Sequence, residues 1–348
     1  ITFIGPTSKQ IKIFGDKINA KKLMKKHKFP VIPGSEDYLK SIDEALETAK
    51  KISYPVILKA GSGGGGKGIR VIKNQKELIA NYAIVKQEVK NSFGNENIYL
   101  EKFFDNPRHI EVQIVADKQG NVVHLGERDC SIQRNKQKII EETPSPTLSN
   151  SQRKKICNLV VKTIKKIGYE SLGTVELLYK NKKFYFMEMN TRVQIEHTIT
   201  ERVTGIDLIK QQIKISAGQK ITFNQKDIQF SGHSIQCRIN AEDPLSFIPS
   251  PGRIKEYHSP GGPGVRIDSA LYAGCIVPHQ YDNLISKIII YSRNRNEAIL
   301  RLKRCLIEYV INGVKTNIPL HLKILNSKDY IKGNYHINWL NKFLSINY

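Results

Sequence analysis

Apolar residues recur along the first two thirds of the chain with two periods, one helical and one strand-like. Windows of roughly helical period cover residues 9–26, 41–52, 74–90, 149–167 and 206–217. Strand patterns lie between them at 98–104, 109–116, 174–179 and 183–189. In the second of these strands, polar His109, Glu111 and Gln113 alternate with apolar residues. We therefore expect one face of that strand to be wet or to contact a ligand.

The pattern changes near residues 222–232. Beyond that point short strands are separated by turns such as SPGR and SPGGPG, and one late helix is predicted at 294–309. We therefore expect a domain boundary at 222–232. The chain opens with the strand-like residues ITFIGP and no initiator Met, so we also expect its start to be incomplete.

Residues 59–72, KAGSGGGGKGIRVI, fit seven of the eight positions of the phosphate-binding pattern G-x-x-x-x-G-K-[ST]. The eighth position fails, because Gly68 stands where a Ser or Thr would contact a metal, and a strand rather than a helix follows. We expect a hairpin with a glycine tip whose backbone lies over a polyphosphate, with positive charge from Lys59, Lys67 and Arg70. A plain glycine turn is the alternative.

Two glutamates are predicted to face each other in the hairpin formed by residues 174–179 and 183–189. If this hairpin is symmetric about Lys182, Glu176 lies opposite Glu188. Facing carboxylates repel, and a divalent cation between them removes the repulsion. Two carboxylates, the amide of Asn190 and a nucleotide phosphate suit Mg²⁺ or Mn²⁺. A solvated polar strand face is the alternative.

The segment MEMNTRVQIEH continues the alternation beyond this hairpin. If the chain stays extended, five polar residues share one face: Glu188, Asn190, Arg192, Gln194 and Glu196. We expect this face to form the floor of a site. His197 breaks the alternation and is expected to make a local hydrogen bond.

Composition narrows the class of protein. The chain has 348 residues, 40% hydrophobic and 25% charged, as in ordinary globular proteins. Its net charge is +23, but only 14 of the 55 basic residues are Arg and the Lys residues form no long block, so no nucleic-acid partner is expected. No apolar run approaches the roughly 20 residues that span a bilayer, so no membrane association is expected. Five scattered Cys without C-x-x-C spacing favour a reducing compartment, cytoplasm or plastid stroma.

Five segments resemble the signatures of biotin carboxylase, an ATP-grasp enzyme: KAGSGGGGKG, EKFFDNPRHIEVQ, GERDCSIQR, MEMNTRVQIEH and CRINAED. The resemblance runs from Phe3 to the end of the chain in order. It implies an α+β protein with an ATP-grasp domain at residues 16–222 and a biotin carboxylase C-terminal domain at 231–340. It also implies that the family's first nucleotide-fold domain is missing, with residues 1–15 as its end and a linker.

The resemblance assigns roles to individual residues. Lys17 and Lys59 contact the ATP phosphates, and a lid over them is formed by Gly63, Gly64, Gly65 and Gly66. Glu101 and Lys102 form the hinge that meets adenine, and His109 and Gln133 contact the ribose or a phosphate. Mg²⁺ is held by Glu176 and Glu188, which agrees with the hairpin interpretation that adds Asn190. Bicarbonate lies near Lys138, Arg192, Gln194, Ile195 and Glu196, and the biotin ureido group lies near Arg238.

The implied chemistry passes through an acyl phosphate. Glu196 acts as general base on bicarbonate, whose oxygen attacks the γ-phosphorus of ATP to give carboxyphosphate. Carboxyphosphate releases CO₂ and phosphate, and phosphate takes the ureido proton. Arg238 stabilises the enolate-like oxygen before CO₂ joins the biotin nitrogen. Lys138 and Arg192 complete the catalytic set.

Two positions depart from the family pattern. Lys136 stands where the family usually has His, and Thr198 stands where it usually has Pro. Lys136 keeps a hydrogen-bond donor but loses the titratable ring, which weakens the expectation of that one nucleotide contact, and the reaction is expected to survive.

The resemblance also implies partners. Biotin arrives on a separate biotin carboxyl carrier protein, because the family attaches it to a Lys flanked by Met, and Met24, Met187 and Met189 lie elsewhere. Further implied partners are the carboxyltransferase subunits of a multi-subunit acetyl-CoA carboxylase, which supplies fatty acid synthesis. A second copy of the chain, in a homodimer, is also implied. Two alternatives stay open, namely another ATP-grasp ligase that forms an acyl phosphate such as carbamoyl phosphate, and a nucleotide-binding module without catalysis.

Overall fold

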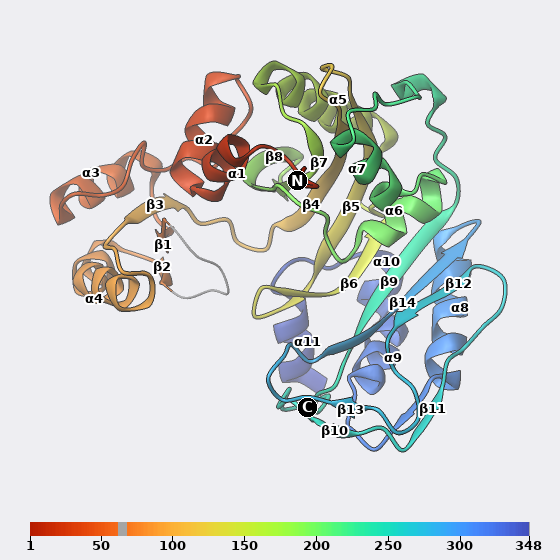
Figure 1. Cartoon of the computed structure of the whole chain (residues 1–348). Coiled ribbons are helices and arrows are strands. Elements are labelled where there is room, and N and C mark those ends of the chain that lie inside the picture. The colour runs from red at the N-terminus through yellow and green to blue at the C-terminus, as the bar shows by residue number, and fades with distance from the viewer. Residues whose placement is uncertain (62–67, 348) are drawn as a thin grey trace.

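The computed structural model of the protein describes residues 1–61 and 68–347. Its largest element is an eight-stranded antiparallel sheet with the strand order β12-β14-β9-β6-β5-β4-β7-β8 (Figure 1). A three-stranded antiparallel sheet, β2-β1-β3, stands apart from it, at the left in Figure 1. Helices cover antiparallel sheets in both parts, as expected for an α+β protein.

The first helical window, residues 9–26, forms two helices rather than one: α1 (Ser8–Gly15) and α2 (Lys17–Lys26). Asp16 separates them, because its backbone is extended and its carboxylate accepts a hydrogen bond from the amide of Asn19 at 2.8 Å, which caps α2. Phe14 of α1 is buried in a core shared with α2 and the large sheet. The second half of residues 1–15, the segment expected to contain a linker, is therefore helical, while most of its side chains are exposed.

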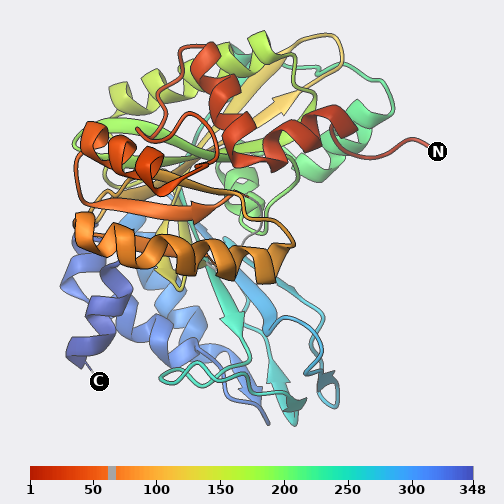
Figure 2. The same ribbon diagram turned by 90° about the vertical axis from the view of Figure 1, so that its left-hand side faces the viewer.

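The three-stranded sheet carries the predicted glycine hairpin. It consists of β1 (Val56–Ala60), β2 (Ile69–Ile72) and β3 (Ile98–Lys102), flanked by α3 (Ile42–Ile52) and α4 (Gln75–Phe93) (Figure 2). Strands β1 and β2 pair antiparallel up to Lys59 and Ile69, which confirms a strand on each side of the glycine loop. The residues of the loop itself, including Gly63, Gly64, Gly65, Gly66 and Lys67, lie outside the described residues.

The centre of the large sheet contains β4 (Arg108–Ala116), β5 (Val122–Arg134) and β6 (Gln137–Thr143), and β7 (Ser171–Lys180) and β8 (Lys183–Asn190) complete one edge. Helix α5 (Asn150–Ile167), capped by Ser149, packs against this part. Every residue of β4 is buried, so its alternating polar face does not contact bulk solvent. Of the two predicted environments, bulk water is excluded for this strand, and contact with a ligand stays a prediction.

The predicted domain boundary does not interrupt the sheet. After α7 (Leu208–Ser216) and a 3₁₀ turn (Gln225–Asp227), β9 (His233–Asn240) pairs directly with β6. Strands β14 (Leu284–Ser292) and β12 (Val265–Ser269) extend the sheet beyond β9. A shared core joins Ile132 and Ile140 to the helices that follow. Residues on β9 are therefore held next to residues on β6.

The remaining elements surround this end of the sheet, in teal to dark blue in the lower half of Figure 1. They are helices α8 (Arg295–Glu308), α9 (Ile318–Asn326), α10 (Lys328–Lys332) and α11 (Trp339–Asn347), and the short strands β10 (Gly252–Arg253), β11 (Glu256–His258), β13 (Ile276–Val277) and β15 (Val310–Asn312). No helix in the described ranges is both long and apolar enough to cross a bilayer.

The expectation that the chain stays extended from Glu188 to Glu196 is wrong. Strand β8 ends at Asn190, and helix α6 (His197–Thr204) follows. The backbone amide of His197 donates to the carbonyl of Gln194 at 3.2 Å, which turns the chain, and Glu196 occupies the N-cap position. Strand β8 lies at the edge of the large sheet, where the described residues add only an isolated bridge between Phe186 and Val31 and no strand beside residues 191–196. The His197 ring also lies 2.7 Å from that carbonyl, which confirms the predicted local hydrogen bond.

Candidate active site

A cavity of about 480 Å³ is lined by residues of both sheets. It collects most of the residues selected from the sequence: Lys17, Lys59, Lys102, His109, Gln133, Lys138, Glu176, Glu188, Asn190, Arg192, Gln194, Ile195, Glu196 and Arg238. Glu101 does not line it. Residues separated by more than 200 positions along the chain therefore meet at one place.

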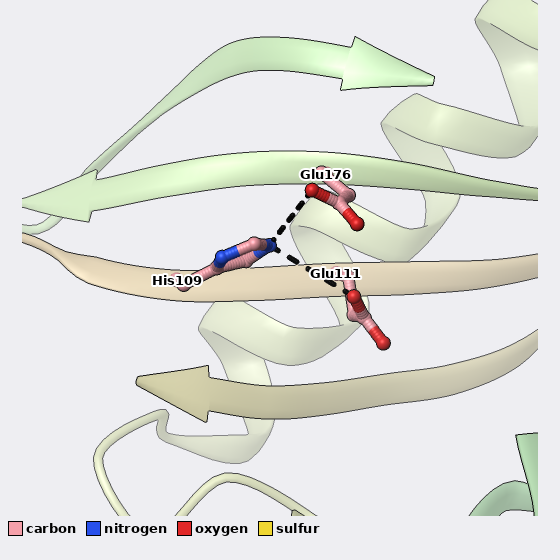
Figure 3. A group of neighbouring side chains, drawn as sticks. All are labelled: His109, Glu111 and Glu176. Carbon is pink, nitrogen blue, oxygen red and sulfur yellow. Dashed lines mark ion pairs between the residues drawn. The ribbon is translucent and has the colours of Figure 1, made fainter. Parts of the chain in front are cut away.

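His109 and Glu176 line one wall of the cavity, and with Glu111 behind them they form a buried group of titratable side chains on β4 and β7 (Figure 3). Glu111 and Glu176 are register partners on these strands. The ring of His109 reaches across, with Nε2 at 3.1 Å from Glu176 Oε2 and 3.8 Å from Glu111 Oε2. The other ring nitrogen, Nδ1, lies 2.7 Å from Nε2 of Gln133. His109 thus connects the carboxylates to the neighbouring strand β5.

Lys138 compensates the negative charge of this group. Its Nζ donates to Glu111 Oε2 at 2.6 Å, to Glu176 Oε1 at 2.9 Å and to Glu196 Oε1 at 2.6 Å. Burial alone would lower the pKa of Lys138, but the carboxylates outweigh it and hold that pKa well above its usual value. Burial would likewise raise the pKa of Glu111, but Lys138 and Arg128 lower it to about 2. Lys138 and Glu111 are therefore held in their ionised forms before any ligand binds.

The predicted pairing of Glu176 with Glu188 is found in the register of β7 and β8, but the expected symmetry about Lys182 is wrong. Lys180 pairs with Lys183 across the turn, and a β-bulge at Met187 shifts the register so that Glu188 lies opposite Glu176. Glu176 Oε1 accepts hydrogen bonds from Asn190 Nδ2 at 2.8 Å and from Gln194 Nε2 at 2.7 Å. Glu188 is half-buried and lines the same cavity. Carboxylate and amide oxygens that share one wall fit the donor set of Mg²⁺ or Mn²⁺.

Glu196 and Arg238 meet although they come from parts of the chain on opposite sides of the predicted boundary. Arg238 Nη2 donates to Glu196 Oε2 at 3.1 Å, and Arg238 Nε donates to Glu141 Oε1 at 2.6 Å. Burial would lower the pKa of Arg238, but Glu141 and Glu196 outweigh it and raise that pKa. With Lys138 on its other oxygen, Glu196 lies between two cations.

The other predicted bicarbonate residues lie on the turn between β8 and α6. Gln194 is buried, and its Oε1 accepts from Arg128 Nη2 at 3.0 Å. Arg192 and Ile195 are exposed but line the cavity. Arg192 donates only to the carbonyl of its neighbour Val193 at 3.2 Å among the described contacts, so the guanidinium has donors left for a ligand.

The end of the cavity nearest the glycine hairpin is rich in lysine. Lys59 and Lys21 both donate to the carboxylate of Glu101, at 2.8 and 3.1 Å. Lys17 and Lys136 make no ion pair with any residue in 1–61 or 68–347. Desolvation and the charges of Lys59 and Lys17 lower the pKa of Lys136. Uncompensated positive charge of this kind favours a polyanionic ligand.

The two residues of the predicted adenine hinge, Glu101 and Lys102, have different surroundings. The carboxylate of Glu101 points to the lysines rather than into the cavity, whereas Lys102 lines the cavity and its Nζ donates to the carbonyls of Ser53 and Tyr54 at 3.0 and 3.1 Å. Any contact from Glu101 to a ligand in this cavity would therefore use its backbone.

Sequence reasoning missed three buried residues of this site: Glu111, Arg128 and Glu141. Glu111 alternates with His109 on a strand already marked as polar on one face, so parity could have found it. Arg128 lies inside the segment GERDCSIQR and bonds Glu111, Gln113, Thr174, Gln194 and Thr200. No local sequence pattern pointed to Glu141, because its partner Arg238 lies on a strand almost 100 residues later.

Two family models match the chain. The model described as "Carbamoyl-phosphate synthase L chain, ATP binding domain" matches residues 16–224, and the model described as "Biotin carboxylase C-terminal domain" matches residues 236–342. The chain is 47% identical to a biotin carboxylase of Pseudomonas aeruginosa, over 99% of this chain and 77% of that protein. It is 48% identical to biotin carboxylase 1 of Bacillus subtilis with the same coverage, and 49% identical to a pyruvate carboxylase subunit from Methanothermobacter thermautotrophicus, over 99% of this chain and 70% of that protein.

Solved structures show the same likeness. The biotin carboxylase domain dimer of Hydrogenobacter thermophilus 2-oxoglutarate carboxylase, in complex with MgADP, ADP and bicarbonate, superposes with a TM-score of 0.95 at 48% identity, covering 98% of this chain and 76% of that one. A biotin carboxylase complex with β,γ-ATP from Campylobacter jejuni gives a TM-score of 0.95 at 46% identity, covering 98% and 77%. With both family models matched in order and relatives close to half identical over nearly the whole chain, this chain belongs to the biotin carboxylase family.

Proposed function

We propose that this chain is an ATP-dependent biotin carboxylase, a ligase that uses bicarbonate to carboxylate biotin on a carrier protein. The observation that carries the proposal is the meeting of Lys138, Glu196 and Arg238 in one cavity with the carboxylate pair Glu176 and Glu188. The cavity thereby places three groups next to one another. They are the carboxylate pair for phosphoryl transfer, the base Glu196, and Arg238 as cationic partner for a developing oxyanion.

The lysine-rich end of the cavity is the proposed ATP site. Lys17 and Lys59 supply charge for the phosphates, and the loop containing Gly63, Gly64, Gly65 and Gly66 is the proposed lid. Lys102 and the backbone of Glu101 are the proposed adenine contacts, and His109 and Gln133 the ribose or phosphate contacts. The uncompensated charges of Lys17 and Lys136 support this assignment.

Glu176, Glu188 and Asn190 are the residues proposed to hold Mg²⁺ or Mn²⁺. When bound, the metal offsets the charge of the ATP phosphates during in-line transfer. Lys138, His109 and Gln194 keep the Glu176 carboxylate fixed in the cavity wall. Burial would raise the pKa of Glu176, but Lys138 and His109 hold it well below its usual value, so an ionised ligand is ready at neutral pH.

Bicarbonate is proposed to bind among Lys138, Arg192, Gln194, Ile195 and Glu196. Glu196 takes the bicarbonate proton, and the freed oxygen attacks the γ-phosphorus of ATP to form carboxyphosphate and ADP. Lys138 and Arg192 offset the negative charge that gathers there. Carboxyphosphate then gives CO₂ and phosphate, phosphate removes the N–H proton of biotin, and the nitrogen attacks CO₂. Arg238 stabilises the ureido oxygen while it carries charge.

The proposed partners follow from the same reaction. A separate biotin carboxyl carrier protein brings biotin, and carboxyltransferase subunits of a multi-subunit acetyl-CoA carboxylase consume carboxybiotin for fatty acid synthesis. A homodimer in cytoplasm or plastid stroma is proposed, with an ATP-grasp domain at residues 16–222 and a C-terminal domain at 231–340. Relatives named biotin carboxylase, one of them chloroplastic, support this context.

A second candidate concerns only the acceptor. Relatives of similar identity are named as subunits of pyruvate carboxylase and of 2-oxoglutarate carboxylase, at 49% and 48%. Carboxybiotin made here would then pass to a 2-oxo acid rather than to acetyl-CoA. Carboxyltransferase assays with each acceptor separate the two.

The main proposal is tested by ATP hydrolysis measured with and without bicarbonate and with and without free biotin. We expect hydrolysis to require bicarbonate and to rise with biotin, together with fixation of labelled bicarbonate on biotin. Bicarbonate-dependent hydrolysis that is indifferent to biotin would instead indicate another acyl-phosphate ligase. Nucleotide binding with no hydrolysis would indicate a non-catalytic module.

A further inference from the structure

Glu141 is a buried carboxylate next to the cavity that none of the proposed steps uses. It lies on β6, has no exposed surface and does not line the cavity. Its two oxygens have separate partners, because Oε1 accepts from Arg238 Nε at 2.6 Å and Oε2 accepts from Gln236 Nε2 at 3.1 Å. Burial of a carboxylate without such partners is costly, so both contacts are needed to keep it in place.

Gln236 is itself held by a third residue. It is the register partner of Glu141 across β6 and β9, and it is fully buried. Its Oε1 accepts a hydrogen bond from Thr198 Oγ1, on the first turn of α6, at 2.6 Å. A hydroxyl that donates to the oxygen of an amide forces the NH₂ group to the opposite side, which here is the side of Glu141.

The contacts at Arg238 fix the plane of its guanidinium. Glu141 holds Nε from one side and Glu196 holds Nη2 from the other. The backbone carbonyl of Arg238 is also fixed, by Asn317 Nδ2 at 3.0 Å and by the His321 ring at 2.8 Å. Within residues 1–61 and 68–347 no protein acceptor lies on Nη1, and Arg238 lines the cavity. A planar guanidinium held at two nitrogens can offer its remaining donors in only one direction.

We propose that Thr198, Gln236 and Glu141 form a hydrogen-bonded relay that orients Arg238 toward the biotin ureido oxygen, with Glu141 as the principal positioning residue. The inference rests on the proposed function in its assignment of Arg238 to biotin. Thr198 sets the orientation of the Gln236 amide, Gln236 and Arg238 together hold the Glu141 carboxylate, and Glu141 sets the plane of the guanidinium. The relay acts through Arg238 and touches no substrate.

A neighbouring residue provides a matched control. Glu142 follows Glu141 on β6, is equally buried, and points to the opposite face, where it pairs with Arg295 at 2.7 Å and with His233 at 2.8 Å. The variants Glu141→Gln and Glu142→Gln therefore remove the same charge from adjacent buried positions, and only the first removes it from the partner of Arg238.

The functional test compares two rates of each full-length variant at saturating ATP. Glu141→Gln is expected to lower kcat for biotin carboxylation about tenfold or more while bicarbonate-dependent ATP hydrolysis without biotin falls by less than about threefold. Glu142→Gln is expected to lower thermal stability and to leave the ratio of the two rates at the wild-type value. Thr198→Val should lower the carboxylation rate about threefold, and Thr198→Ser, which keeps the hydroxyl, should restore it. Equal losses of both rates in Glu141→Gln would overturn the proposal.

A second measurement does not depend on activity. In ¹H–¹⁵N spectra of the arginine Nε–H groups, the Arg238 signal, assigned by its loss in Arg238→Lys, is expected to be shifted downfield and slow to exchange with water. Glu141→Gln should move it upfield and speed its exchange, and Glu142→Gln should leave it in place. An unmoved signal in Glu141→Gln would overturn the relay even if the enzyme carboxylates biotin. If the wild type carboxylates no biotin but the signal moves as expected, the proposed function fails and the relay stands.

Discussion

The two ends of the cavity differ in how far their positive charge is balanced, although Lys59 at the lysine-rich end is also paired, with Glu101. At the catalytic end, Lys138 contacts three carboxylates and Arg238 contacts two. At the nucleotide end, Lys17 and Lys136 have no acidic partner in residues 1–61 and 68–347. Paired charges build the catalytic group before any substrate arrives, whereas unpaired lysines leave their charge for an external polyanion.

The difference has a structural cause. The paired cations lie on central strands of the large sheet, where burial makes an unpaired charge costly. Lys136 lies in the exposed turn between β5 and β6 with a left-handed backbone (φ 68°), where water and a ligand can both reach it. The location in the sheet therefore decides whether a cation is part of the framework or available for binding.

The largest loss of activity is expected from a change at Glu196, the proposed general base. Glu196→Gln is expected to lower biotin carboxylation about 10²–10⁴-fold, because the amide cannot take the bicarbonate proton. Fixation of labelled bicarbonate on biotin measures it. Glu201→Gln, on the same helix α6 but outside the cavity, is the control and should lose less than about twofold. Comparable losses in both variants would remove Glu196 from the role of base.

The contrast between paired and unpaired lysines predicts unequal effects on stability when each is removed. Lys138→Met should cost about 3–5 kcal/mol of unfolding free energy, because three buried carboxylates lose their common partner. Lys136→Met should change the unfolding free energy by less than about 0.5 kcal/mol, since no carboxylate would be left without its partner. Urea unfolding of both variants measures the difference. Equal destabilisation would contradict the division into paired and unpaired charge.

Acid should weaken the paired end. Glu111 has a folded-state pKa of about 2, below the ordinary value of about 4.3, and the pKa of Glu176 is also lowered. A carboxyl with a depressed pKa stabilises the fold fully above its unfolded pKa and loses that contribution as the pH falls toward the folded one. Unfolding free energy should therefore fall by about 2–3 kcal/mol for Glu111 alone between pH about 5 and about 2. Glu111→Gln should flatten this part of the pH profile, and an unchanged slope would argue against the ionised cluster.

The smallest expected effect concerns ATP affinity at the unpaired end. Lys136→Met should raise the Kd for ATP about tenfold at low salt, because one charge near the phosphates is lost. The loss should shrink as ionic strength rises, since exposed charges are screened. Calorimetry at two salt concentrations measures both. Lys28→Met, which removes an exposed lysine elsewhere, should leave the Kd unchanged. A salt-independent effect of Lys136→Met would indicate a packing role instead.

Several features of this site are determined by short-range sequence. The hairpin of β7 and β8 was predictable from its turn residues. The pairing of Glu176 with Glu188 was predicted for the wrong reason, because it depends on a β-bulge at Met187 that turn symmetry does not contain. The strands around the glycine loop followed from β-branched residues after Gly68. The predictions of the hairpin and of these strands needed only neighbours along the chain, because local backbone geometry fixes them.

Other features depended on the tertiary structure. The alternation from Glu188 to Glu196 suggests a strand, but β8 ends at Asn190, the amide of His197 closes a turn on the carbonyl of Gln194, and Glu196 is the N-cap of a helix. The contacts of Lys138 and Glu141 with residues up to 97 positions away arise from the order of strands in the large sheet. Sequence by itself predicted most of the residues that line the cavity and most of the local elements that hold them. Only the sheet order decided which charges are paired, because pairing between β6 and β9 is a long-range contact that no local pattern encodes.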